Sequence, residues 1–200
     1  MPGSAITVAF IAVLSTVACS GPNVEATVEA RLAQERAIEA TVEARLKTAL
    51  PTQGLITAID TENTESVKEI LGAGINPNKN PVPVGFPLTG AYPLHLAVVK
   101  GNKEIVQILL DNGAKIDIKA KNKDEATPLA WAAFLGQKDA VSLLIEAGAP
   151  INPIDANQYT PLDAAGIAWR ASQDNAAWAK NLMEIMTIIK ANGGKHADEL

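Results

Sequence analysis

The most regular pattern of apolar and polar positions lies between residues 91 and 152, where one arrangement occurs twice. Each copy has a proline before a first apolar run, then a glycine, a second apolar run and a closing glycine–alanine pair. The markers keep one offset of 35 residues, from Pro93 to Pro128, from Gly101 to Gly136 and from Gly113 to Gly148. A repeat of this length is typical of stacked units that each bury only one face.

The apolar positions within each copy follow helical spacing. A proline fits the first helical turn, where no amide hydrogen bond is lost, and a glycine fits the left-handed residue that follows a helix. The pattern therefore predicts two helices in each copy, at about 94–100 and 104–112 and at about 129–135 and 139–147.

Two further copies flank this pair. Residues 55–76 repeat its helical part without the proline-containing turn, as expected for a terminal unit with one face in solvent. The last copy opens with Thr160-Pro161-Leu162-Asp163, but its proline lies 32 residues before Gly193, where the earlier copies use 20. The additional residues predict longer helices with a turn near 172–175, and a mobile polar tail is expected at 196–200.

The turn sequences carry a family resemblance. Thr127 to Ala132 resembles the Thr-Pro-Leu-His-x-Ala element of the ankyrin repeat, and Tyr92 to Ala97 resembles it less fully. The closing glycine–alanine pairs, each shortly before Ile-Asp or Ile-Asn, are also similar to that repeat. The resemblance implies an all-α ankyrin-repeat solenoid of helix-turn-helix units joined by β-hairpin loops. It covers residues 54–200, with units at about 54–90, 91–125, 126–158 and 159–200.

The resemblance also implies a binding surface. In the ankyrin family, partners usually dock on a concave face formed by the hairpin tips and the first helix of each unit. That face would include Val99, Lys100, Phe134 and Leu135, with Tyr159 at its rim. The alternative for Phe134 and Leu135 is that they pack beneath the long hairpins or on Trp169. Aromatic anchors dominate many interfaces, so we expect these residues to contact a protein partner.

Two other conspicuous residues have structural explanations. His95 falls on the histidine of the ankyrin turn motif, which the family uses to brace adjacent loops. Trp131 lies beside Ala132, on the side of its helix that faces neighbouring units, so we expect it in the core. The prolines and glycines between residues 77 and 90 form the longest insertion. It is either a rigid recognition element or, as we expect, a spacer.

The chain begins with an apolar leader. Residues 1–22 carry no charged side chain, and the run from 5 to 18 matches the core of a secretory signal, although preceding positive residues are missing. The run ends at Val17-Ala18-Cys19 and resembles the lipobox of bacterial lipoproteins, with Thr16 as a departure. This resemblance implies a signal peptide at 1–18, lipidation of Cys19 and a lipid-anchored, extracytoplasmic location in the bacterial envelope. A freely secreted protein and a simple uncleaved anchor are the alternatives.

A helical stalk is expected between the leader and the repeats. The sequence Glu-Ala-Thr-Val-Glu-Ala-Arg-Leu occurs at 25–32 and again at 39–46, and its apolar residues fall on one helical face. Charged residues interrupt a strict heptad seam, so a solitary stalk and a coiled coil that makes the chain a homo-oligomer both remain open. Residues 19–53 are therefore interpreted as stalk and linker.

Composition narrows the chemistry. The chain is 48% apolar but only 4% aromatic, which suits helices packed through small residues. Its net charge of −5, without a basic stripe, argues against a nucleic-acid partner. One cysteine and two histidines leave little for a metal site, and His196 in the expected tail is a poor ligand by itself. Without a phosphate loop or a nucleophile motif, we expect no cofactor, no metal and no catalytic residue.

These features together predict a non-catalytic module that binds a protein partner at the cell envelope. One alternative is a structural or oligomeric envelope scaffold that uses the helix at 23–50. The other is a small-molecule or enzymatic role in the groove of the solenoid.

Overall fold

The computed structural model describes residues 33–34, 36–37, 54–84, 88–172 and 174–200. The chain divides into two compact units, Met1–Ala44 and Arg45–Leu200. The predicted leader, Cys19 and most of the predicted stalk lie outside the described residues, although 33–34 and 36–37 are helical. The second unit contains the repeats.

This unit is built from pairs of short helices. Residues 54–60 are helical and precede α2 (Thr64–Gly72). The next two pairs are α3 (Pro93–Lys100) with α4 (Lys103–Asp111) and α5 (Pro128–Phe134) with α6 (Lys138–Glu146). The last pair is longer, with α7 (Pro161–Ala171) and α8 (Ala176–Ala191), and a 3-10 helix, η1 (Ala197–Glu199), follows. The described residues contain no strand, so the predicted all-α class is confirmed.

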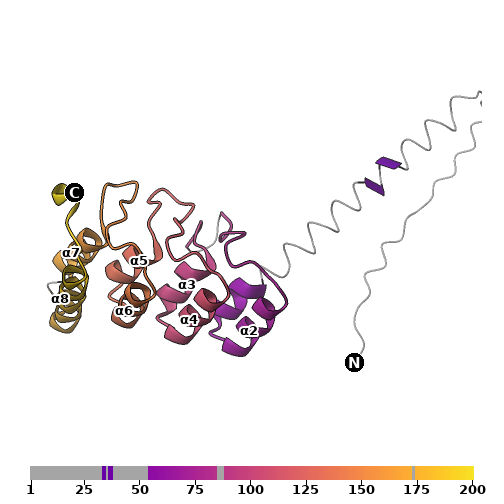
Figure 1. The fold of residues 1–200 in the computed structure, drawn as a ribbon, viewed down its shortest axis with the longest axis horizontal. Helices are drawn as coiled ribbons and strands as arrows, with labels where there is room; N and C mark the ends of the chain where they lie inside the picture. The colour runs from indigo at the N-terminus through magenta and orange to yellow at the C-terminus, as the bar shows by residue number, and fades with distance from the viewer. Residues whose placement is uncertain (1–32, 35, 38–53, 85–87, 173) are drawn as a thin grey trace, which may run out of the picture. The chain divides into compact units, whose positions relative to one another are not determined.

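The pairs stack into a solenoid with two rows of helices (Figure 1). Contacts between α3, α5 and α7 form one row, and contacts from α2 through α4 and α6 to α8 form the other. The long loops between pairs extend to the same side of the rows. The helices of the middle units lie within about one residue of the predicted bounds, and the turn between α7 and α8 falls where the extra residues indicated.

Local sequence sets the helix ends. Proline is the first residue of α3, α5 and α7, and Thr127 caps α5 by accepting a hydrogen bond from the amide of Ala130 at 3.4 Å. Gly113 has φ of 80° after α4, and the next amide, of Ala114, returns to the carbonyl of Leu109 at 2.9 Å. This left-handed residue satisfies a helix-ending carbonyl, as predicted for Gly113 and its counterpart Gly148.

One continuous apolar core runs through the stack. Fully buried alanines, among them Ala97, Ala132 and Ala165, let the helices of the first row approach closely. Larger side chains fill the space between the rows, and each contributes roughly 1.5–3 kcal/mol by leaving water. The largest that are fully buried are Leu55, Ile59, Leu94, Ile105, Leu109, Leu129, Leu144, Leu162, Leu182, Ile185 and Ile189.

The loops turn back as hairpins without forming a β-ladder. One is closed by the amide of Ala120 on the carbonyl of Ala126, and the next by the amide of Asp155 on the carbonyl of Tyr159, both at 3.0 Å. A single bond of this kind is too little for a regular strand pair. The implied β-hairpins are therefore present as turns. Successive loops are joined by hydrogen bonds from the amide of Lys121 to the carbonyl of Gly90 and from the amide of Ala156 to the carbonyl of Asp124, both at 2.8 Å.

An asparagine clamp connects the first loop to the second unit. Asn78 donates to the carbonyl of Gly113 at 2.8 Å and accepts from the amide of Lys115 at 2.7 Å. The corresponding positions of the next junction hold Asp117 and Pro150. An ionised aspartate has no donor and proline has no amide hydrogen, so this junction cannot form the same clamp.

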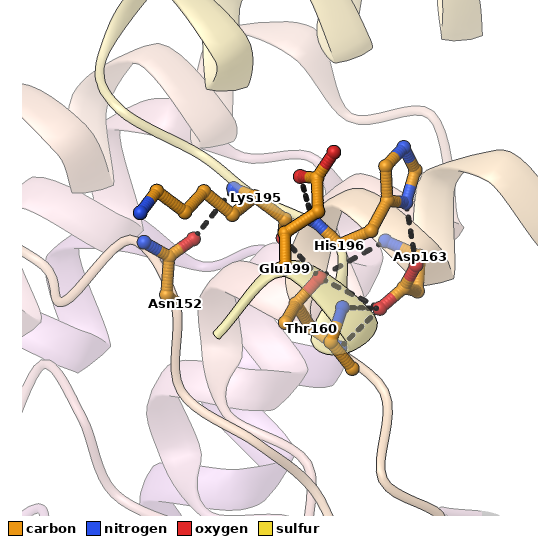
Figure 2. A network of polar contacts seen from close by, with 7 residues as sticks. Asn152, Thr160, Asp163, Lys195, His196 and Glu199 are labelled. Atoms are coloured by element: carbon orange, nitrogen blue, oxygen red, sulfur yellow. Dashed lines mark hydrogen bonds and ion pairs between the residues drawn. The ribbon is translucent and has the colours of Figure 1, made fainter.

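The clamp returns at the last junction, where it fixes the C-terminal segment. Asn152 donates to the carbonyl of Gly193 at 3.0 Å and accepts from the amide of Lys195 at 2.8 Å. Figure 2 shows Asn152 and Lys195 on one side of this network, with His196 and Glu199 beyond them. Asn152 thus holds the turn after α8 in the same way that Asn78 holds the turn after α4.

Asp163 binds the same segment from α7 (Figure 2). It stands at the motif position that His95 holds in the second unit. Its carboxylate accepts from the amide of Ala197 at 3.0 Å, and Nδ1 of His196 lies 2.6 Å from its other oxygen. Burial by itself raises the pKa of Asp163, but the hydrogen bonds from His196, Thr160 and Ala197 outweigh it and lower the pKa below its ordinary value. The prediction of a mobile tail is wrong, because His196 and Ala197 are hydrogen-bonded to the carboxylate of Asp163 in α7.

Candidate functional site

A groove of about 440 Å³ lies between the loops and the first row of helices. The middle helix, α5, contributes Trp131 and Phe134 to it, and Leu135 follows directly. Ala164 and Ile167 of α7 lie on one side, and Val99 of α3 lies on the other. The groove is therefore lined mainly by apolar side chains from three successive units.

Four of the five predicted contact residues line this groove. They are Val99, Phe134, Leu135 and Tyr159, and the last three expose 46%, 37% and 44% of their surfaces. Phe134 and Leu135 therefore keep part of their surface open to the groove and are not fully buried beneath the hairpins. Lys100 does not line the groove, because its ammonium pairs with Asp60 at 2.7 Å. Contact of these residues with a partner stays a prediction.

The proline-rich insertion also reaches the groove through Leu88, whose side chain is 39% exposed. Val82 of the same loop is buried, and its carbonyl accepts from the amide of Gly90 at 2.8 Å. Gly90 in turn accepts from the amide of Lys121 in the next loop at 2.8 Å. The insertion was expected to be a spacer, but it packs against its neighbour and adds an apolar side chain to the groove.

His95 supports the floor of the groove. It is fully buried, accepts from the amide of Tyr92 at its Nδ1 (3.3 Å) and places Nε2 3.1 Å from the carbonyl of Ala126. These partners require a neutral ring with its hydrogen on Nε2. Burial lowers the pKa of His95 to about 4, although the bond to Ala126 acts in the opposite direction. The predicted bracing of adjacent loops is confirmed.

Trp131 has two roles. Its ring meets His95 in an edge-on contact, with centroids 5.0 Å apart, and it packs against the apolar core. It is only half-buried and its remaining surface lines the groove. The prediction of core packing is thus right for one face of the ring, while the other face belongs to the candidate site.

Two aspartates lie where the loops meet the groove. Asp155 Oδ1 accepts from the amides of Asn157 and Tyr159, both at 2.8 Å, and so shapes the loop that presents the Tyr159 ring. The Asn157 side chain donates to Asp124 of the preceding loop at 3.1 Å. Sequence reasoning missed Asp124 and Asp155, because their convergence depends on the stacking of two units.

The described part of the chain shows neither a metal site nor a membrane-spanning helix. Those residues include no group of three or more histidine, cysteine, aspartate or glutamate side chains able to hold a metal ion. None of their helices combines the length and apolar character needed to cross a membrane.

Comparison with protein families accounts for the stacked helix pairs. The family model described as Ankyrin repeats (3 copies) matches residues 16–120 and 55–155. The chain belongs to the ankyrin-repeat family. Ankyrin repeats are generally protein–protein interaction modules. No curated protein matches the chain at a significant level.

The structure extends the ankyrin stack past the matched residues. Helices α7 and α8 begin after residue 155, yet α7 packs on α5 and α8 packs on α6. Thr160 and Pro161 open α7 as Thr127 and Pro128 open α5. This last ankyrin unit supplies Ile167 to the groove, so the candidate site needs the part of the chain that the family model does not reach.

Proposed function

We propose that this ankyrin-repeat protein is a non-catalytic module that binds a protein partner in the groove. The observation that carries the proposal is the convergence of Leu88, Phe134, Leu135 and Tyr159, all partly exposed, on one apolar hollow. Exposed apolar patches bordered by polar residues mark interaction sites, and aromatic side chains in a pocket supply much of the binding energy. A partner side chain that fills the groove would remove these surfaces from water.

Replacing Phe134 and Leu135 together by alanine is expected to abolish partner capture. The purified full chain and the double variant would be immobilised and exposed to an extract of bacterial envelope proteins. Binding would bury the 46% and 37% of these residues that the free protein exposes, so each contributes on the order of 1 kcal/mol and the double change weakens binding by about tenfold to a hundredfold. Circular dichroism should show equal folding, because both side chains are exposed in the free protein.

Met183→Ala is the matched control, since Met183 is 53% exposed on α8 and does not line the groove. It should capture the same protein as the parent. A protein captured equally by the parent and by the Phe134→Ala, Leu135→Ala variant would place the binding surface elsewhere and refute the role of the groove.

We also propose that the protein is exported and anchored at Cys19 to the bacterial envelope. The support is in the sequence, where the apolar run at 5–18 ends in small residues just before the single cysteine. Acyl chains on one residue anchor stably, since each buried methylene contributes about 0.8 kcal/mol. Expressed in a bacterium that processes lipoproteins, the chain should incorporate labelled fatty acid and sediment with membranes. Cys19→Ala should lose the label, and an unlabelled parent would refute the anchor.

A further inference from the structure

The charged residues of the groove are of one sign. Among the described residues that line it, the two that carry charge are Asp124 and Asp155, from two successive loops. Both belong to loops, and they share the groove lining with the apolar residues of α5 and with Tyr159. A partner side chain seated in the groove would therefore bring its neighbouring residues up to these carboxylates.

Neither carboxylate has a cationic partner in the described part of the chain, since the ion pairs found there involve other residues. Two lysines outside the groove lining have other partners. Lys100 pairs with Asp60, and the ammonium of Lys119 donates to the carbonyl of Ile154 at 3.0 Å. Lysines 121 and 123 are exposed on the loop of Asp124, but they do not line the groove.

We propose that the groove selects a protein segment in which an apolar side chain is followed or preceded within a few residues by lysine or arginine. This inference rests on the proposed function and specifies its partner. The apolar side chain would fill the hollow beside Phe134 and Leu135. The cation would then meet the exposed Asp124 and the half-buried Asp155. The bound partner would shield these contacts from water, which strengthens charge-assisted hydrogen bonds. Like charge in the partner is disfavoured at the same place.

The chain offers a nearly isosteric test of charge. Asp155→Asn keeps an oxygen that can accept from the amides of Asn157 and Tyr159, so the loop geometry survives. Asp124→Asn likewise keeps an acceptor for the Asn157 side chain. The double variant removes two negative charges from the groove and preserves its shape. Asp174→Asn with Asp198→Asn removes the same charge from exposed positions outside the groove.

The experiment uses a displayed library of random dodecapeptides as the probe and the immobilised full chain as the target. Each enriched peptide is then measured against the Phe134→Ala, Leu135→Ala variant, to which a peptide seated in the groove should bind much more weakly. We expect the enriched peptides to pair an apolar side chain with a nearby lysine or arginine. Their affinity should fall about tenfold or more for the Asp124→Asn, Asp155→Asn variant and stay within about twofold for the control variant. Added salt should weaken binding to the parent more than to the double asparagine variant.

Other outcomes overturn the inference in distinguishable ways. Enriched peptides that are neutral or acidic, or that bind the double asparagine variant as tightly as the parent, refute the charge selection and leave the apolar groove as the binding site. Enriched peptides that are insensitive to Phe134 and Leu135 refute the groove itself, and with it the proposed function. A selection that enriches no peptide refutes recognition of a short linear segment.

Discussion

A Gly90→Ala variant is expected to lose about 3 kcal/mol of its free energy of unfolding. Gly90 has φ of 81°, a conformation in which other residues cost about 1–2 kcal/mol. A methyl group at this position would also overlap the carbonyl group of Lys121. The two loops would have to separate, and the 2.8 Å hydrogen bond from the Lys121 amide to Gly90 would be lost.

Alanine substitutions at two other glycines separate the cost of the left-handed backbone from the cost of the overlap with Lys121. Gly113 has φ of 80° but open space around a Cβ, so Gly113→Ala should cost only about 1 kcal/mol. Gly166 lies inside α7 with open space and an ordinary helical conformation, so Gly166→Ala should add about 0.5–1 kcal/mol. Urea unfolding followed by circular dichroism gives all three values. Equal losses for Gly90→Ala and Gly113→Ala would show that the contact between the loops contributes nothing.

The helices could be predicted because the residues at which they begin and end constrain the backbone conformation. Proline at the start of α5 and glycine after α4 each permit few conformations, and the 35-residue offset repeats them. Apolar periodicity then fixes which face of each helix is buried. These signals are local, so they survive without knowledge of how the units stack.

The groove was only partly predictable, because some of its residues come together through contacts between units and not through local sequence. Val99, Phe134, Leu135 and Tyr159 follow from the family resemblance, which assigns positions within one unit. Leu88 comes from an insertion without a counterpart in the other units. Asp124 and Asp155 stand in different loops and meet only because two units stack. A sequence pattern carries no signal for such a meeting.

The sequence did indicate that the C-terminal segment is held in place, although the short, polar composition of residues 196–200 favoured a free tail. However, the last turn motif has Asp163 where the motif histidine would stand, and His196 is the second of two histidines in the chain. A carboxylate in place of an imidazole accepts hydrogen bonds where the ring would donate one, and the amide of Ala197 and the ring of His196 supply them.

The buried, neutral side chain of His95 predicts that the folded protein loses stability in acid. With a pKa of about 4 in the folded protein and the ordinary value of 6.5 in the unfolded chain, His95 takes up its proton first in the unfolded state. The unfolded state therefore binds more protons between these values, and the free energy of unfolding falls as the pH falls. The loss from this residue reaches about 3 kcal/mol near pH 4, at about 1.4 kcal/mol per pKa unit. Burial is the main cause of the lowered pKa, because the charged ring would lose its hydration, and a proton on Nδ1 would also remove the acceptor that the Tyr92 amide uses.

Urea unfolding at pH 7, 5.5 and 4 measures this loss, and a nuclear magnetic resonance titration of the ring reports its pKa directly. His95→Gln should be less stable than the parent at pH 7 by about 1–3 kcal/mol, since Tyr92 and Ala126 lose well-placed partners. Its stability should then change much less between pH 6.5 and 4. In a His196→Ala variant His95 is the remaining histidine, and the full drop should persist. Asp163 has a lowered pKa in the folded protein, so its ionised form stabilises the fold at pH values above the ordinary pKa of an aspartate. That contribution is lost only as the pH falls through the lowered pKa of Asp163. A His95→Gln variant with the same pH dependence as the parent would contradict the buried, neutral histidine.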